Sequence, residues 1–294
     1  MSKILSSIEY SENVDLRQFC TIKIGGIGTK VYFPKDIYQI SDLLKESNYQ
    51  NKPVFPLGIG SNVIFKDGKI DKFFIHSKNL KKFNYWENGE YFYVEAEAGV
   101  SFKTIVNFVK KYNLEGFENL SGIPATIGGA VAMNAGAFGS EIFDLIEEIT
   151  WIDKEGNIFR SKKSEIEFSY RYTQFQKDSF VYSAILKLKK SNKNISEIIK
   201  NHLLERNKKQ PLDKPTSGST FKNPSNYSAG YLLEKSGLKG KRINDIGFSE
   251  KHSNFLVNYG NAKFKDLIQL LEHAEKSVLD NFNINLEREI KIVE

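Results

Sequence analysis

The chain has 294 residues, of which 40% are hydrophobic and 27% are charged, a composition typical of a folded globular protein of one to three domains. One cysteine excludes an internal disulfide, and the four scattered histidines lack any spacing typical of a metal site. The net charge of +6 comes from dispersed lysines rather than from a basic stripe, which argues against a nucleic-acid-binding protein.

The first part of the chain predicts a mixed α+β unit. Hydrophobic periodicity predicts a helix at residues 36–48 and strands at residues 29–34, 53–57, 62–67 and 72–76. Residues 81–99 are typical of a hairpin that turns at Asn88-Gly89, because this dipeptide accepts positive φ angles. An amphipathic helix capped by Ser101 is expected over residues 101–113.

The rest of the chain continues to mix strands and helices. A second hairpin is expected around Glu155-Gly156, and a helix that ends before Pro211 is expected from residue 195. Turn residues and two prolines predict a loop at residues 213–226. The remaining expected elements are strands at 179–190 and 286–293 and a helix at 262–282. The order of elements lacks regular β-α-β alternation, which favours the α+β class with two or three subdomains.

No run of eighteen apolar residues occurs, and the N-terminal segment lacks the apolar core and cleavage site of a signal peptide. We therefore expect a cytoplasmic protein that does not bind a membrane.

Two glycine-rich segments are candidates for contacts with an anionic ligand. In LGIGSN, glycines 58 and 60 allow backbone amides to converge on an anion, and Ser61 and Asn62 add donors, although a glycine-rich turn between two strands is more often purely structural. In SGIPATIGGAVAMNAGAFG, residues 121–139, the glycines let the main chain lie against a ligand; close helix packing is the alternative. The glycines in question are Gly122, Gly128, Gly129 and Gly136.

Three further segments contain polar side chains that can take part in catalysis. Only six arginines stand beside 36 lysines, so each arginine is expected where its planar fork matters, and Arg171 lies beside Tyr170. Ser219 lies in SGSTF, followed by Lys222 and Asn223, and Glu289 lies in the alternating terminal segment. Taken singly, these residues fit surface stacking, hydrogen-bonded turns and a solvated strand carboxylate equally well.

Together and in this order, the motifs resemble one family, the UDP-N-acetylenolpyruvoylglucosamine reductases, over nearly the whole chain. The matching motifs are TIKIGG, LGIGSN, SGIPATIGGAVAMNAGAFG, FSYRY, ERNKKQP, SGSTFKNP, LLEKSGLKG, FSEKHSNFLVN and LEREI. The resemblance implies a two-subdomain FAD-binding module of the vanillyl-alcohol-oxidase type, with subdomains at 1–78 and 79–205. A substrate-binding domain at 206–294 would follow, with its last strand returning to the active site.

The resemblance also implies a cofactor and a set of site residues. FAD would be held without a covalent bond, since no histidine lies in the glycine loops. NADPH would reduce the flavin, and the enolpyruvyl sugar nucleotide would then accept a hydride at C3, in peptidoglycan precursor synthesis for the cell wall. Catalytic roles would fall to Ser219 as proton donor, Arg171 as stabiliser of the enolate and Glu289 as second acid. Substrate contacts would come from Tyr170, Arg206, Lys222 and Asn223, and cofactor contacts from Gly58, Gly60, Ser61, Asn62, Gly122, Ile123, Gly128, Gly129, Ala130, Asn134 and Gly136.

The chain departs from the family pattern in two places. Ala125 stands where the family usually has glycine, which argues against a positive φ there. Only 47 residues separate Arg171 from Ser219, as in the shorter subtype, so the contacts to the uridine end stay open. The competing readings are an oxidase built on the same FAD module and a basic binding module without catalysis. The sequence leaves the oligomeric state open, and a monomer is the default expectation.

Overall fold

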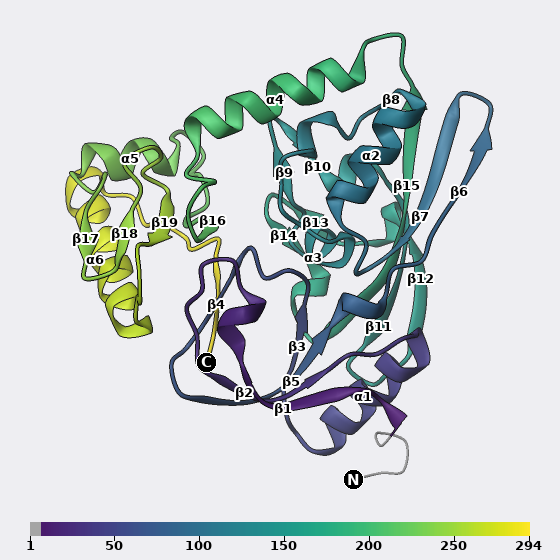
Figure 1. Ribbon diagram of the computed structural model, residues 1–294, viewed down its shortest axis with the longest axis horizontal. Coiled ribbons are helices and arrows are strands. Elements are labelled where there is room, and N and C mark those ends of the chain that lie inside the picture. Colours follow the sequence, from purple (N-terminus) through teal and green to yellow (C-terminus); the bar gives the residue numbers. More distant parts are fainter. Residues whose placement is uncertain (1–6) are drawn as a thin grey trace. The chain divides into compact units, whose positions relative to one another are not determined.

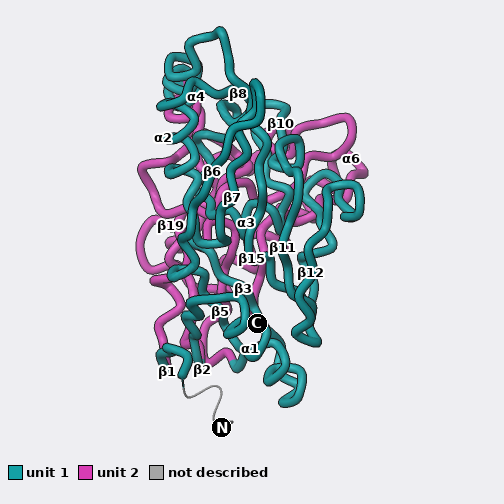
Figure 2. Tube along the Cα trace, turned by 90° about the vertical axis from the view of Figure 1, so that its right-hand side faces the viewer, with its two compact units in different colours: residues 1–12, 29–59, 71–204 teal, residues 13–28, 60–70, 205–294 magenta. Residues whose placement is uncertain are grey.

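Figure 1 shows the computed structural model, which describes residues 7–294. The first six residues, on which part of the expected absence of a signal peptide rests, lie outside the described residues. Two compact units make up the chain and have different colours in Figure 2. Unit 1 contains residues 1–12, 29–59 and 71–204, and unit 2 contains residues 13–28, 60–70 and 205–294. Among residues 7–294, no helix is both long and apolar enough to span a bilayer.

The helices are α1 (Ile37–Tyr49), α2 (Phe102–Tyr112), α3 (Ile127–Ala132), α4 (Ile195–Lys209), α5 (Ala229–Lys235) and α6 (Phe264–Phe282). The first ten strands are β1 (Tyr10–Asp15), β2 (Ile27–Tyr32), β3 (Val54–Leu57), β4 (Val63–Phe65), β5 (Lys69–His76), β6 (Phe83–Asn88), β7 (Tyr91–Glu97), β8 (Leu114–Glu115), β9 (Gly136–Ala137) and β10 (Ser140–Glu141). The others are β11 (Ile146–Asp153), β12 (Ile158–Lys162), β13 (Phe168–Ser169), β14 (Tyr172–Thr173), β15 (Ser179–Lys190), β16 (Thr216–Ser219), β17 (Arg242–Ile243), β18 (Ile246–Phe248), β19 (Phe255–Asn258) and β20 (Lys291–Val293).

The larger sheet of unit 1 holds the glycine-rich segment in place. Its strands follow the order β12–β11–β15–β7–β6, with antiparallel neighbours, and β8 pairs with the end of β15. Buried side chains of α2 and α3 share one hydrophobic cluster with β7, β11 and β15. Because α3 contains Gly128 and Gly129, this core fixes the middle of the segment from Ser121 to Gly139.

A smaller sheet, in the order β1–β2–β5–β3, supports the first glycine loop. Buried Ile40, Leu43 and Leu44 of α1 pack into the same cluster as Tyr32 of β2 and Phe73 of β5. β3 runs parallel to β5, and its last residue, Leu57, leads directly into the loop LGIGSN. The chain crosses from unit 1 to unit 2 within this loop, between residues 59 and 60.

Unit 2 consists of an antiparallel sheet in the order β16–β19–β18–β17 and a parallel pair formed by β4 and β20. α6 contacts α5, β17 and β18. It buries one apolar face that includes Leu267, Leu271, Ala274 and Val278. Asn283 then ends α6 in the left-handed conformation.

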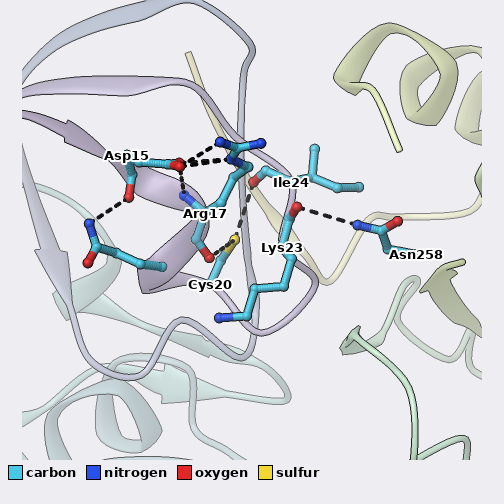
Figure 3. A network of polar contacts seen from close by, with 7 residues as sticks. Asp15, Arg17, Cys20, Lys23, Ile24 and Asn258 are labelled. Carbon is cyan, nitrogen blue, oxygen red and sulfur yellow. Dashed lines mark hydrogen bonds and ion pairs between the residues drawn. The ribbon is translucent and has the colours of Figure 1, made fainter. Parts of the chain in front are cut away.

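The segment that contains TIKIGG belongs to unit 2 and is tied to β19. Figure 3 shows that the side-chain amide of Asn258 donates to the carbonyl of Lys23, at 3.4 Å. The same amide lies 3.0 Å from the carbonyl of Ile22. The thiol of Cys20 donates to the carbonyl of Ile24 at 3.2 Å, and burial raises its pKa. Cys20 is therefore a structural residue of this segment.

Local sequence signals correctly predicted most of the regular elements. Ser101 caps α2 as expected, since its hydroxyl accepts from the amide of Thr104 at 3.2 Å. β15 spans residues 179–190, and α4 ends at Lys209, before Pro211. Ala125 is absent from the residues with positive φ, in agreement with the expectation for this position.

The first hairpin turns one residue later than predicted. Asn88 pairs with Tyr91, so the two turn residues are Gly89 and Glu90. Gly89 takes the positive φ angle, +61°, and Asn88 stays in the strand. The glycine suffices for this turn because only its first central position needs positive φ.

Two predictions for the C-terminal part are wrong in their boundaries. The expected loop at 213–226 contains a strand, β16, which pairs with β19; Pro215 and Pro224 flank the strand rather than interrupt it. The expected strand at 286–293 is regular only from Lys291, because its partner β4 offers three residues. The preceding residues lie against the chain after β16, through an isolated bridge between Arg288 and Phe221.

Candidate functional site

The structure brings the two glycine-rich segments together in unit 1. A Cβ atom added to Gly58 would lie 2.5 Å from the hydroxyl of Thr126, which precedes α3. No side chain fits at position 58, so its glycine is required by close approach of the two segments. The two candidate segments for contacts with an anionic ligand therefore lie next to each other.

The glycines of the second segment do two different jobs. Gly128 packs on β7, since an added Cβ would lie 2.7 Å from the Cβ of Ala98 and its amide donates to the Ala98 carbonyl at 3.0 Å. Gly129 is exposed, and the hydroxyl of Thr126 is the nearest atom to an added Cβ, at 3.6 Å. The packing alternative therefore explains Gly128, whereas Gly129 leaves main chain open to a ligand.

Other residues expected at the cofactor differ in their accessibility. Ala130 is buried in the core, and Ile123 packs against it while its amide donates to the Leu120 carbonyl. Gly122 is partly exposed. Gly136 admits no side chain, because an added Cβ would lie 2.5 Å from the carbonyl oxygen of Ser140.

Two buried hydroxyls beside these glycines fit a bound FAD. The hydroxyls of Ser121 and Thr126 are buried and have no hydrogen-bond partner among the described residues. A buried polar group without a partner costs about 1–3 kcal/mol, a cost that a ligand with polar atoms can remove. The Thr126 hydroxyl also lies beside the exposed main chain of Gly129, so this part of unit 1 offers polar groups suited to the cofactor.

The second half of the first glycine loop lies in unit 2, where it is tightly packed. Gly60 has a φ of +69°, and an added Cβ would lie 1.9 Å from the carbonyl oxygen of Phe19. Ser61 is partly exposed. The side-chain amide of Asn62 donates to the carbonyl of Glu289 at 3.0 Å, so this residue joins the loop to the terminal segment.

Arg171 lies at the tip of a tight hairpin in unit 1. Ser169 of β13 pairs with Tyr172 of β14, which leaves Tyr170 and Arg171 as the turn residues. Arg171 has a φ of +56°, a conformation that costs a residue other than glycine about 1 kcal/mol. Backbone strain of this kind is concentrated at functional sites.

The guanidinium of Arg171 is held from several sides. Nη2 donates to the carbonyl of Gly136 at 2.8 Å, and Nη1 donates to the carbonyl of Asn134 at 3.3 Å. Nη1 also lies 3.6 Å from a carboxylate oxygen of Glu141. The ring of Tyr170 lies 4.8 Å from the guanidinium carbon. Arg171 is thus fixed against the glycine-rich segment, with its side chain only 14% exposed.

In unit 2, the segments of Ser219 and Glu289 lie side by side. The amide of Glu289 donates to the carbonyl of Thr220 at 2.8 Å, which places Glu289 next to the residue after Ser219. Gly218, with a φ of +75°, allows the chain to turn at the end of β16. Three hydroxyls around Ser219 are buried without a partner among the described residues, those of Thr216, Ser217 and Thr220. The main-chain segments that carry the predicted proton donor and the predicted carboxyl group therefore lie side by side.

The two residues after Ser219 that were expected to bind substrate have structural partners. The ammonium of Lys222 lies 2.6 Å from a carboxylate oxygen of Glu287, and its amide donates to the Glu287 carbonyl. The side-chain oxygen of Asn223 accepts from the amide of Ala229, at the start of α5. Both residues thus brace the loop that carries Ser219.

Arg206 is the most unusual cation of unit 2. It lies in the last turn of α4 with 8% of its surface exposed, and its Nε has no hydrogen-bond partner among the described residues. Among the described residues no anionic side chain lies beside it, and burial alone lowers its pKa. A buried charge of this kind is costly unless an anion joins it.

Two further residues lie at these sites without a motif that indicates them. Glu141 contacts both Arg171 and Asn134, and it follows the glycine-rich segment without any local motif. Lys291 is half-buried on β20, where burial and the nearby Lys222 lower its pKa, and its amide donates to the carbonyl of Asn62. The alternation of the terminal segment could have indicated Lys291 as a partner of Glu289.

Each unit thus contains one part of the predicted site. Unit 1 joins Gly58, the glycine-rich segment and Arg171, and unit 2 joins residues 60–62 with Ser219 and Glu289. Within the part of the chain that the structure describes, no cluster of metal-ligating side chains occurs.

Comparison with known proteins agrees with this arrangement. Residues 29–162 match a family model described as an FAD binding domain, and residues 210–293 match the C-terminal domain of UDP-N-acetylenolpyruvoylglucosamine reductase. The reductase of Aquifex aeolicus is 44% identical over 97% of this chain and 95% of its own length. That of Fusobacterium nucleatum is 40% identical over 96% of this chain and 98% of its own length.

A solved structure agrees as well. The crystal structure of UDP-N-acetylenolpyruvylglucosamine reductase from Thermus caldophilus superposes with a TM-score of 0.81 at 27% identity, covering 98% of this chain and 99% of its own. The predicted fold class, an FAD-binding module followed by a C-terminal α+β domain, is confirmed. The chain therefore belongs to the UDP-N-acetylenolpyruvoylglucosamine reductase family and is an FAD-dependent oxidoreductase.

Proposed function

We propose that this protein uses NADPH to reduce the enolpyruvyl group of UDP-N-acetylglucosamine enolpyruvate to the lactyl ether of UDP-N-acetylmuramate. The reaction would supply peptidoglycan precursors in the cytoplasm. One observation carries the proposal beyond family membership. The hydrogen bond from the Glu289 amide to the Thr220 carbonyl joins the main-chain segments that carry Glu289 and Ser219, two residue types suited to proton delivery.

The FAD-binding residues proposed here come from the loop LGIGSN and from the glycine-rich segment. Gly58, Gly129 and the hydroxyls of Ser121 and Thr126, which have no partner among the described residues, would hold the cofactor. Gly60 and Ser61 of the same loop would add backbone and hydroxyl donors. Bound FAD, once reduced by NADPH, supplies the hydride for the reaction.

Arg171 would stabilise the charge that forms on the substrate. Hydride addition at C3 leaves negative charge at C2, which is delocalised into the substrate carboxylate. A guanidinium already fixed in place stabilises this charge without reorganisation during the reaction. The contacts of Arg171 with the carbonyls of Gly136 and Asn134 supply that fixation.

Ser219 would then donate its hydroxyl proton to C2. A hydroxyl is a weak acid, but the enolate is a strong base, so the transfer is favourable. Glu289, joined to Thr220 through its backbone, would polarise the enol ether and assist proton delivery. Ser219 would thus supply the proton of the new C–H bond, and Glu289 would polarise the bond beside the carbon that accepts it.

Arg206 would bind an anionic part of the substrate, such as its diphosphate. Among the described residues its buried guanidinium has no anionic partner, as expected of a cation that binds an anionic ligand, in the ligand-free protein. Tyr170, 44% exposed beside Arg171, offers a ring face to the substrate, and Lys222 and Asn223 would orient it through the Ser219 loop. We propose a monomer that acts on two small molecules.

The test uses the purified protein. A yellow protein absorbing near 450 nm, with NADPH oxidation that depends on the enolpyruvyl sugar nucleotide and yields UDP-N-acetylmuramate, would support the proposal. A coloured protein that oxidises an alcohol or sugar and ignores the nucleotide would identify an oxidase of the same fold. Colourless protein would contradict both and favour a binding module without catalysis.

A further inference from the structure

One buried residue links the glycine-rich segment to the hairpin that carries Arg171. Asn134 is fully buried and has a φ of +43°. Its side-chain amide donates to a carboxylate oxygen of Glu141 at 2.7 Å and to the carbonyl of Ser169 at 2.9 Å. Its side-chain oxygen accepts from the amide of Phe143 at 3.4 Å. Because these contacts use both amide hydrogens, the Asn134 side chain acts within the protein and holds Glu141 in position.

Glu141 has one oxygen for Asn134 and one for Arg171. Oε2 accepts from Asn134, and Oε1 lies 3.6 Å from Nη1 of Arg171. An added Cβ on Gly136 would lie 3.0 Å from Cγ of Glu141 and 3.1 Å from Nη1, so only glycine lets the two side chains meet there. The amide of Glu141 donates to Asp144 at 2.8 Å, which fixes the backbone as well.

We propose that Glu141 is a positioning residue for Arg171: it orients the guanidinium toward the substrate without contacting the substrate itself. The proposal deepens the proposed function and rests on it. Arg171 lies at the tip of a two-residue turn, and the carbonyls of Gly136 and Asn134 and the ring of Tyr170 restrain its side chain through contacts with uncharged groups. The Glu141 carboxylate, itself fixed by a buried amide, adds a charged contact, and a small misplacement of a catalytic group is costly in rate.

The first experiment measures single-turnover oxidation of the NADPH-reduced holoenzyme by the enolpyruvyl sugar nucleotide, followed at 450 nm. We expect Glu141→Ala to lower the limiting rate constant about tenfold to a hundredfold, with the half-saturating substrate concentration changed less than threefold. Glu141→Gln, which keeps an acceptor for Asn134 but loses the charge, is expected to lose about threefold to tenfold. The rate of flavin reduction by NADPH and the flavin content should not change.

A matched control comes from the same unit. Glu148 pairs with Arg160 across β11 and β12, so Glu148→Ala also removes a carboxylate from an arginine pair. This control should leave the limiting rate constant within twofold of the unaltered enzyme. A loss as large as that of Glu141→Ala would show a general effect on unit 1 and overturn the proposal.

A double-mutant cycle separates positioning from other roles. In an Arg171→Lys background, Glu141→Ala should cost less than twofold, because the guanidinium that it orients is gone. Equal losses in both backgrounds would overturn the proposal.

Chemical rescue gives a readout that a merely structural residue would not affect. Guanidinium ion at millimolar concentration should restore part of the turnover of Arg171→Ala, and its half-saturating concentration should rise at least fivefold when Glu141→Ala is added. An unchanged half-saturating concentration would contradict the proposal. If the unaltered protein failed to reduce the sugar nucleotide, the proposed function itself would fail, an outcome distinct from these.

Discussion

Arg171 in unit 1 and Arg206 in unit 2 differ in the partners of their guanidinium groups. Arg171 donates to two backbone carbonyls and lies beside the carboxylate of Glu141. Arg206 is more deeply buried, and among the described residues nothing anionic is recorded beside it. Under the proposed function, the two arginines would serve different purposes. Arg171, already partnered, would be oriented in advance for a charge that forms during the reaction, whereas Arg206 would gain its anionic partner when the substrate binds.

The largest expected effect on turnover comes from Ser219 in unit 2 rather than from either arginine. Ser219→Ala removes the proposed proton donor, so turnover should fall by several decades, because the enolate then lacks an acid beside it. Loss of NADPH oxidation with the sugar nucleotide measures this effect. FAD content and flavin reduction by NADPH should stay normal. Turnover near that of the unaltered enzyme would remove Ser219 from the mechanism.

Arg171→Lys tests whether orientation or charge matters in unit 1. Lysine keeps the positive charge but loses the planar fork that spans the carbonyls of Gly136 and Asn134. We expect turnover to fall on the order of tenfold to a thousandfold. Steady-state kinetics with Arg160→Lys as a matched control gives the comparison, since Arg160 pairs with Glu148 away from the hairpin. Unchanged turnover would return Arg171 to a structural role.

Arg206→Met should stabilise the protein, whereas replacement of an arginine that has an anionic partner usually destabilises it. Removing a buried charge without a partner is expected to stabilise the FAD-loaded, substrate-free protein by about 1–3 kcal/mol. The thermal midpoint should rise by about 2–6 °C. Arg288→Met is the control in the same unit, because Arg288 pairs with Glu275 at 2.9 Å, and this variant should melt lower. A lower midpoint for Arg206→Met would mean that its charge already has a partner.

The half-buried His76 extends the comparison, since histidine can lose its charge and arginine cannot. Burial, together with the nearby Lys78, lowers the pKa of His76 to about 4. In the unfolded chain the imidazole of His76 has a pKa near 6.5, so below that pH it binds a proton that the folded protein does not bind. The free energy of unfolding therefore falls as the pH falls toward 4.

Replacing His76 should remove part of this pH dependence. Between pH 7.5 and 5.5 we expect His76→Asn to lose about 1 kcal/mol less stability than the unaltered protein. Asparagine keeps an acceptor for the Lys78 amide, which His76 binds at 3.0 Å. Thermal unfolding at both pH values, with exposed His273→Asn as control, measures the difference. Equal pH dependence of His76→Asn and the unaltered protein would contradict the neutral state of His76.

The parts that the sequence predicts well are those whose signals are local. The Ser101 cap and the apolar face of α2 lie within one helical segment, and the glycine of each predicted hairpin turn is found in the turn. β16 was missed because its partner β19 lies some 40 residues further along, and the prolines around it resemble a loop. The terminal strand is short because β4, a segment more than 200 residues earlier, limits the pairing.

The candidate site divides in the same way. The residue types and their order indicated Ser219, Arg171 and Glu289 through the family resemblance, but no local pattern shows which contacts each one makes. The contact of Glu141 with Arg171 depends on the fold and not on a local motif. The lack of an anionic partner for Arg206 among the described residues depends on how α4 is buried. Such states are properties of packing between distant segments.

We propose that Arg171 serves the chemical step and Arg206 serves substrate binding. The most direct test is the dependence of the oxidative half-reaction on substrate concentration, measured by stopped flow with reduced enzyme. We predict that Arg171→Lys lowers the limiting rate constant and leaves the half-saturating concentration of the sugar nucleotide nearly unchanged. Arg206→Met should raise that concentration about tenfold or more and leave the limiting rate constant nearly unchanged. If both variants changed the same parameter, the distinction between a guanidinium for chemistry and one for binding would be wrong.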